Sequence, residues 1–165
     1  MDKLSDVTHI QQLLLQKDLW LKKSSEGANS LFRAISVCLY FTERYEEVIR
    51  KLVISFFYQG YAPSFKNEIQ LKMKDRYLQN VSLFEFEPLN LEIISCLFNV
   101  EINMFYLQDQ QLKVDCYKPE SQLHIKLVRI SEMNYAALFS RPQKEIYSFV
   151  QNIVLSLVEI GRAFV

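Results

Sequence analysis

The periodicity of apolar residues changes near residue 100, and this change constrains the fold more than any other feature of the sequence. Before it, apolar residues recur every three or four positions, as in helices. After it, short segments rich in β-branched and aromatic residues predict strands at 100–107, 112–117, 123–130 and within 131–140. Helices that precede strands in this way predict an α+β domain with a small sheet.

The expected helices differ in how much of their surface is apolar. Residues 30–41 are apolar nearly all round, which predicts a central helix packed on several sides. Between helices, the segment "WLKKSSEGAN" (20–29) predicts a loop. Asn90 is a plausible cap for a helix over 89–98. The other expected helices have one apolar face and span 4–18, 43–58, the middle of 66–88, and 144–160.

The helix expected over 144–160 leaves two interpretations open. Its apolar face could pack on the core of the domain, or it could bind a partner. The N-terminal segment, 1–18, is amphipathic and has no signal-peptide pattern. Because no stretch is apolar enough to span a bilayer, we expect a cytoplasmic protein without a membrane partner.

Composition argues against several classes of function. Nineteen basic and nineteen acidic residues give a net charge of zero, which only weakly supports RNA binding. Three cysteines, Cys38, Cys96 and Cys116, form no CxxC pair, and there are two histidines, so neither a metal site nor a cofactor is expected. The apolar neighbours of the cysteines predict buried thiols in a reducing compartment.

Three segments resemble, in order and spacing, the signature blocks of the OTU (ovarian tumour) family of deubiquitinating cysteine proteases. They read "NSLFRAIS", "LEIISCLFNVEINMFYL" and "IKLVRISEMNYAALFS". The resemblance covers about residues 15–164 and implies one OTU-like domain over 1–165, with a papain-like cysteine protease fold whose small mixed sheet packs between helices. The helix after "ALFSRP" also resembles the extension found in the fruit-fly ovarian tumour subgroup.

The resemblance implies a mechanism. In the family, a thiolate at a helix N-terminus attacks the carbonyl that joins the C-terminus of ubiquitin to a lysine. A histidine keeps the sulfur ionised, and a carboxylate or amide orients that histidine. Backbone N–H groups of the preceding turn bind the oxyanion.

The positions that match these roles hold other residues. Ser30 matches the nucleophile, Gly27 the aspartate of the turn, Asn134 the histidine and Ala136 the orienting residue. The family's aromatic residue is kept as Tyr135, and we expect Asn29, Ser30 and Tyr135 to contribute to binding. A single cysteine-to-serine substitution made to inactivate an enzyme would not explain the changes at 134 and 136.

These substitutions predict a catalytically inactive homologue. Asparagine cannot act as a general base, because its amide nitrogen is not basic. Neither His9 nor His124 has a sequence reason to reach Ser30, whose hydroxyl is expected to cap the helix start. We therefore expect a pseudoenzyme that binds ubiquitin or a regulatory protein. The alternatives are an active deubiquitinase and a scaffold that binds RNA or germline regulators.

Overall fold

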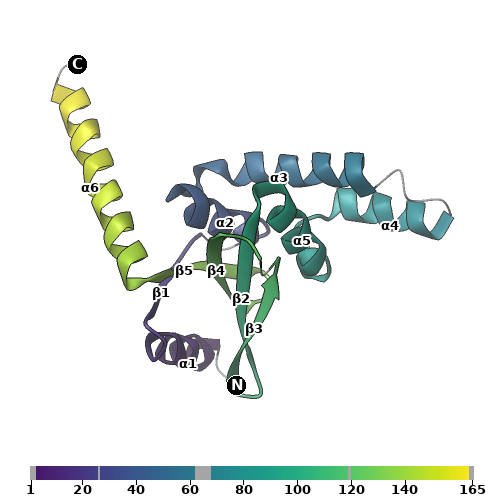
Figure 1. Cartoon of the computed structure of the whole chain (residues 1–165), viewed down its shortest axis with the longest axis horizontal. Helices are drawn as coiled ribbons and strands as arrows, with labels where there is room; N and C mark the ends of the chain where they lie inside the picture. The colour runs from purple at the N-terminus through teal and green to yellow at the C-terminus, as the bar shows by residue number, and fades with distance from the viewer. Residues whose placement is uncertain (1–2, 26, 62–67, 119, 164–165) are drawn as a thin grey trace.

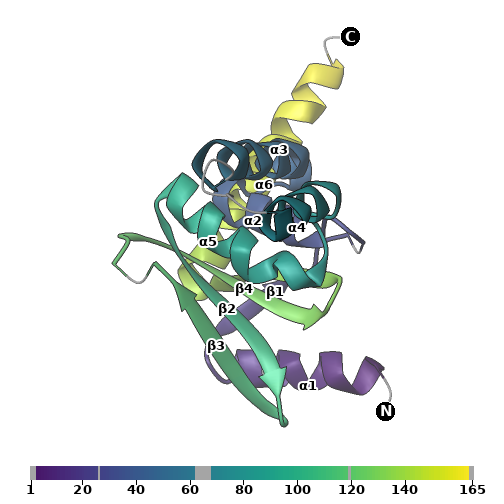
Figure 2. The same ribbon diagram turned by 90° about the vertical axis from the view of Figure 1, so that its right-hand side faces the viewer.

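A computed structural model describes residues 3–25, 27–61, 68–118 and 120–163. The central element is a five-stranded mixed sheet that lies between helices (Figure 1). Figure 2 shows helix α1 on one face of this sheet and helices α2, α3, α4 and α5 on the other side. This arrangement confirms the α+β class and the mixed sheet predicted from the sequence.

Most helices precede most strands, as expected from the periodicity, although one short strand lies between the first and second helices. The helices are α1 (Lys3–Leu15), α2 (Ser30–Tyr40), α3 (Glu46–Phe56), α4 (Glu68–Gln79), α5 (Glu87–Phe98) and α6 (Arg141–Ala163). Short helical turns occupy η1 (Glu43–Tyr45), η2 (Phe57–Tyr61) and η4 (Phe84–Phe86). The strands are β1 (Leu19–Lys22), β2 (Val100–Gln108), β3 (Gln111–Tyr117), β4 (Leu123–Ser131) and β5 (Asn134–Ser140).

The strand order in the sheet is β1-β5-β4-β2-β3. Strands β2 and β4 are parallel, and the other neighbouring pairs are antiparallel. A two-residue turn joins β2 to β3, and both of its residues, Asp109 and Gln110, have positive φ, as expected for a tight hairpin. The first strand therefore pairs with the last one, with Lys22 opposite Ala137.

Strand β5 separates two apolar cores because successive side chains point to opposite faces. Tyr135 belongs to the core beneath α2, α3 and α5, and Ala137 packs with α2. Ala136 and Leu138 instead contact the cluster formed by Ile10 and Leu14 of α1. The side of β5 on which a residue lies thus decides which helix it meets.

The prediction of a loop over residues 20–29 was wrong at its start. Residues 19–22 form strand β1, which pairs with β5. Leu19 and Leu21 pack in the apolar cluster under α1. The segment is a strand because β5 offers its edge for pairing, and four residues carry too little periodicity to reveal that.

Asn90 does not cap a helix, contrary to the sequence prediction. Helix α5 already begins at Glu87, with Pro88 in its first turn, where a missing N–H costs nothing. Asn90 is buried, and its side-chain amide accepts a hydrogen bond from the Tyr77 hydroxyl (2.7 Å) and donates one to the Val81 carbonyl (2.7 Å). It therefore joins α5 to α4 and to the loop that follows α4.

Candidate functional site

Ser30, the residue at the nucleophile position, lies at the first turn of α2 and is 1% exposed. Its Oγ accepts a hydrogen bond from the Tyr135 N–H (2.8 Å) and donates one to the Tyr135 carbonyl (3.2 Å). Strand β1 ends at Lys22, opposite Ala137, so it does not reach Tyr135. The Ser30 hydroxyl therefore pairs with the backbone of β5 where the neighbouring strand has ended.

This pairing determines what the hydroxyl can do. A serine hydroxyl has one proton, and that of Ser30 is hydrogen-bonded to the Tyr135 carbonyl, which is not basic enough to remove it. The predicted role of Ser30 as a helix cap was wrong, because Asn29 holds the N-cap position and makes no side-chain cap bond. The Asn29 side chain accepts a hydrogen bond from the Ser82 hydroxyl (2.8 Å) instead.

The turn before Ser30 has a backbone conformation that favours glycine. Gly27 has φ +122°, a region in which an aspartate at this position would be strained. The Ser30 N–H donates to the Gly27 carbonyl (2.9 Å). The N–H of Ser30 itself is therefore already used and is not available to an oxyanion.

Asn134 and Ala136 line a cavity of about 300 Å³ on the α1 side of β5. Val7, Thr8 and Gln11 of α1 form the opposite wall of this cavity. Ala136 is 1% exposed and packs in the apolar cluster of α1. A carboxylate in place of Ala136 would be buried among apolar side chains, which is strongly unfavourable.

Both histidines bond to groups other than Ser30. His124 Nδ1 lies 3.3 Å from a carboxylate oxygen of Glu101, on the neighbouring strand β2. His9 Nε2 lies 3.3 Å from the carbonyl oxygen of Gln110, in the hairpin between β2 and β3. The hydrogen bonds of the Ser30 hydroxyl described here both go to Tyr135. These contacts support the expectation that neither imidazole serves Ser30.

The Tyr135 side chain points to the face of β5 opposite to that of Asn134 and Ala136. There it joins a buried polar network that sequence reasoning missed. Its hydroxyl donates to Glu87 Oε2 (2.5 Å), and Arg129 pairs with Glu87 Oε1 (2.7 Å). Burial, together with the Glu87 carboxylate, raises the pKa of the Tyr135 hydroxyl. The Arg129 guanidinium also lies over the rings of Phe84 (4.9 Å) and Tyr106 (4.7 Å). Tyr135 is thus held both through its backbone, by Ser30, and through its side chain, by Glu87.

Ser24 is a second residue of the site that the sequence did not indicate. Its hydroxyl donates to the Tyr135 carbonyl (2.9 Å), which therefore accepts from two serines. Ser24 also lines the cavity shared by Asn134 and Ala136. Because Ser24 lies in a polar loop without periodicity, no local signal could have singled it out.

A second hollow of about 250 Å³ adjoins the two segments that carry the family positions. Ala28, two residues before Ser30, and Met133, directly before Asn134, both line it. Ser82 and Leu83 contribute from the loop after α4. The two segments that carry the family positions are therefore next to two hollows, one lined by Asn134 and Ala136 on the α1 side of β5 and one lined by Ala28 and Met133.

The three thiols do not replace the missing nucleophile. Cys38 lies on α2, two turns beyond Ser30, and burial raises its pKa to about 12. A buried thiol that stays protonated at neutral pH is a poor nucleophile. The expectation that all three cysteines are buried was wrong for Cys96 and Cys116, which are exposed on α5 and β3.

We predict that a maleimide reagent at pH 7.5 will modify Cys96 and Cys116 in the folded protein but spare Cys38. Access favours the exposed pair, although Cys116 has a raised pKa, caused by desolvation and by Glu101. Mass spectrometry of digested samples will identify the labelled sites, and unfolding in guanidinium will provide the fully labelled control. Rapid labelling of Cys38 in the folded chain would contradict its burial.

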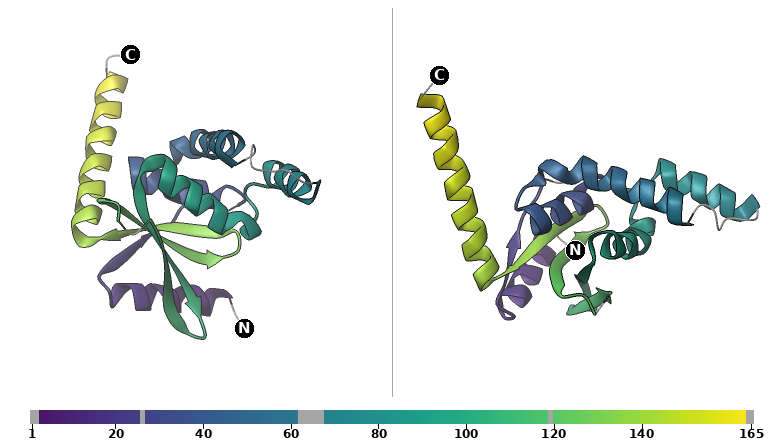
Figure 3. Two further views of the ribbon diagram at one scale, coloured as in Figure 1. Left: turned by 45° about the vertical axis from the view of Figure 1, so that its right-hand side comes forward. Right: turned by 45° about the horizontal axis from the view of Figure 1, so that its top comes forward.

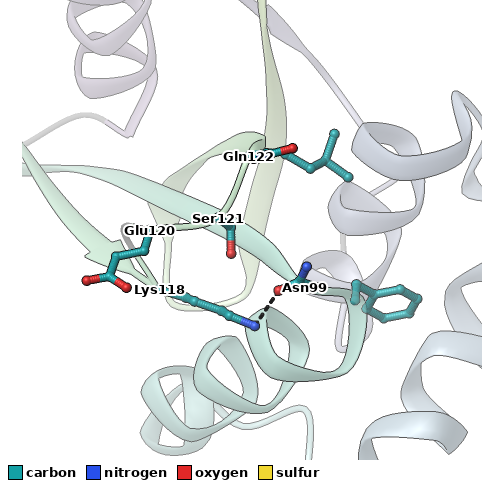
Figure 4. Close-up of a pocket in the computed structure, with 7 residues that line it drawn as sticks. Asn99, Lys118, Glu120, Ser121 and Gln122 are labelled. Atoms are coloured by element: carbon teal, nitrogen blue, oxygen red, sulfur yellow. Dashed lines mark hydrogen bonds between the residues drawn. The ribbon is translucent and has the colours of Figure 1, made fainter.

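The largest cavity described, of about 850 Å³, lies at the other end of β4 from Tyr135 (Figure 4). Lys118 Nζ donates to Asn99 Oδ1 (2.6 Å), beside the C-terminus of α5, where a cation is favoured by the helix dipole. Leu123 lines this cavity and begins β4, whereas Arg129, opposite Tyr135, lies near its end. The cavity is therefore separate from the Ser30 site.

The fold is that of OTU domains. The OTUD1 OTU domain superposes with a TM-score of 0.65 and 17% identity, over 84% of this chain and 97% of that chain. An OTU domain solved in complex with ubiquitin superposes with a TM-score of 0.58 and 17% identity, over 79% of this chain and 81% of that chain. The viral OTU domain protease from Farallon virus superposes with a TM-score of 0.55 and 14% identity, over 75% of this chain and 85% of that chain.

Sequence comparisons give no match. Neither a protein-family model nor a curated protein matches the chain. The described residues contain no group of three or more histidine, cysteine, aspartate or glutamate side chains that could hold a metal ion. Within the same ranges, no helix is both long and apolar enough to cross a bilayer. The structural similarities therefore establish the class of fold.

Proposed function

We propose that this chain is a member of the OTU family that binds ubiquitin and does not cleave it. The observation that carries the proposal is the pairing of the Ser30 hydroxyl with both backbone groups of Tyr135. A nucleophile needs a base that removes its proton. The Ser30 hydroxyl donates to the Tyr135 carbonyl instead of to a base. Asn134 and Ala136 occupy the positions that match the family's base and orienting residue.

The expected loss of rate is large. Removing the nucleophile or the base of a catalytic triad lowers the rate by about 10⁴–10⁶. Two further features support inactivity. The Ser30 N–H is bonded to Gly27, and the site of the orienting residue, Ala136, is apolar and buried. Restoring the thiol alone would therefore leave an incomplete site.

Binding has different requirements from cleavage. Hydrogen bonds and apolar contacts to an extended tail do not need a thiol. The hollow beside Ala28 and Met133 adjoins the family positions and exposes two apolar side chains, Leu83 (40%) and Met133 (39%). One of the structurally similar OTU domains was solved with ubiquitin bound. We assign the C-terminal tail of ubiquitin to this hollow.

The first experiment measures cleavage. The purified chain is incubated with diubiquitins and with a fluorogenic ubiquitin C-terminal amide, beside the Farallon virus OTU protease as positive control. We expect no product above the no-enzyme blank at enzyme amounts that cleave fully with the viral protease. Turnover by the native chain that is lost in Ser30→Ala would refute the inactive assignment and favour an active deubiquitinase.

The second experiment measures binding. Titrating ¹⁵N-labelled ubiquitin with the native chain should shift resonances of the ubiquitin tail. Leu83→Glu should weaken the interaction at least about ten-fold, since a charge replaces a central apolar contact. Leu123→Glu is the matched control, because Leu123 lies by the cavity at the far end of β4. Unchanged spectra at high micromolar chain would exclude ubiquitin and favour a regulatory protein as the partner.

Three finer predictions still rest on the sequence alone. These are the similarity to the fruit-fly ovarian tumour subgroup, a cytoplasmic location, and RNA as an alternative partner. The balanced charge of the chain continues to weigh against RNA, because phosphate contacts need a basic surface. A filter-binding titration with single-stranded RNA at low and physiological salt would test that alternative.

A further inference from the structure

Among the described residues, the contacts that hold helix α6 to the domain lie near its base. The Tyr147 ring packs against Phe41 (5.9 Å between centroids) and Phe139 (5.3 Å). Gln151 Nε2 donates to the Phe41 carbonyl (2.9 Å). Beyond this point the helix extends away from the sheet and from the other helices (Figure 1; Figure 3). Of the two interpretations left open for this helix, packing on the core therefore does not apply to its outer turns.

The outer turns carry an unusual number of exposed apolar side chains. Along α6 they are Ile146, Phe149, Ile153, Val154, Leu155, Leu157, Val158 and Ile160. Single exposed apolar residues are common on protein surfaces, whereas contiguous patches of this extent mark interaction sites. The helix therefore presents a surface that is suited to burial.

Five of the apolar residues of α6 follow the spacing of a coiled coil. Ile146, Val150, Ile153, Leu157 and Ile160 are separated by four, three, four and three positions, and we call this set the α6 stripe. At 100° per residue, the stripe centres about 120° around the helix from Tyr147 and Gln151. Because those two residues contact the domain, the stripe points away from it.

We propose that the α6 stripe is a self-association surface, covered by the same stripe of a second copy of this chain. Between Ile146 and Val158 the sequence "IYSFVQNIVLSLV" contains no charged residue. Two copies can therefore meet along these turns without like-charge repulsion. The 4-3 spacing is that of coiled-coil core positions, which pack against an identical set on a partner helix.

The identities of the core residues fit a helix-packing surface. In heptad terms, Val150 and Leu157 hold a positions, and Ile146, Ile153 and Ile160 hold d positions. All five are branched apolar residues of the kind that fill the core positions of coiled coils. The apolar flanking residue Phe149 widens the surface in the same direction.

A membrane surface fits α6 less well. Helices that lie on anionic bilayers carry lysines and arginines along their polar face. Between Ile146 and Val158 the polar face of α6 instead presents Ser148, Asn152 and Ser156, and its basic residues, Arg141, Lys144 and Arg162, lie only near the two ends of the helix. The charge pattern therefore favours another protein helix, and the self-complementary spacing favours a second copy.

The test compares two leucines of α6 with nearly equal exposure. Leu157 belongs to the stripe and is 63% exposed, whereas Leu155, 60% exposed, lies on the opposite side of the helix. Sedimentation velocity of the full native chain, from low to high micromolar, should show masses above the 19.6 kDa of one chain. Leu157→Glu should raise the dissociation constant at least about ten-fold, and Leu155→Glu should leave it unchanged.

Circular dichroism of both variants establishes that each is folded, and Ile153→Gln provides a second, uncharged disruption of the stripe. A native chain of one-chain mass throughout the concentration range overturns the proposal. Equal dissociation by Leu157→Glu and Leu155→Glu also overturns it. Flotation of the native chain with phosphatidylcholine–phosphatidylserine vesicles, lost in Leu157→Glu, would identify a membrane as the occupant instead. Ubiquitin binding should be the same in all variants, since α6 lies apart from the hollow beside Ala28.

Discussion

Glu87→Ala is expected to lower the free energy of unfolding by about 3–5 kcal/mol, the range for removing one partner of a buried ion pair. Glu87 is 3% exposed and accepts from both Arg129 and the Tyr135 hydroxyl. Without the carboxylate, a guanidinium with a largely buried side chain and a buried phenol each lose a hydrogen-bond acceptor. Chemical denaturation by urea, followed by tryptophan fluorescence and circular dichroism, will measure the change.

Glu85→Ala is the matched control for this prediction. Glu85 lies two residues before Glu87 and pairs with Arg76, but both side chains are substantially exposed. Exposed pairs contribute about 0–1 kcal/mol, so this variant should remain near the native midpoint. Similar midpoints for the two variants would show that the network around Glu87 does not anchor β5.

Ser30→Ala is expected to lower the free energy of unfolding by about 1–3 kcal/mol, the cost of leaving a buried polar group without a partner. The variant loses the hydrogen bond from the Tyr135 N–H, and nothing in the described contacts replaces it. The Tyr135 carbonyl keeps one donor, Ser24. For a chain of this size the melting temperature should fall by about 2–4 °C per kcal/mol.

Two serine-to-alanine controls separate the role of Ser30 from a general effect of the substitution. Ser24→Ala removes one of two donors to the Tyr135 carbonyl and should cost less than Ser30→Ala. Ser156→Ala removes an exposed bond within α6 and should be nearly neutral. If Ser30→Ala were as mild as Ser156→Ala, the Ser30 hydroxyl would be free to act, and the case for inactivity would weaken.

The sequence predicted the fold to the extent that local patterns determine it. The apolar residues of α2 and the strand-like segments after residue 99 correctly indicated a central helix and a sheet. Strand β1 was missed because its four residues become a strand only by pairing with β5, more than a hundred residues later. The helix expected over 89–98 begins two residues earlier, at Glu87, because proline is well tolerated in the first turn of a helix.

The candidate site was also predicted only in part. The positions of Ser30 and Asn134 came from a resemblance of whole blocks, and the structure places both next to Tyr135. What the Ser30 hydroxyl contacts depends on where β1 ends, which no local pattern specifies. The network of Glu87, Arg129 and Tyr135 joins an α5 residue to two strands, 42 and 48 residues away in sequence. Only the folded chain brings these three together.

The pairing of the first strand with the last has a consequence for synthesis. Lys22 can pair with Ala137, its partner in β5, only after Ala137 has been synthesised. At translation rates of about 5–20 residues per second, that delay is on the order of 10 s. During this time α1, β1 and α2 have emerged from the ribosome without the strand that covers them. Folding of the domain is therefore completed only after β5 has been made, and nascent chains that stop before β5 are candidates for chaperone binding or degradation.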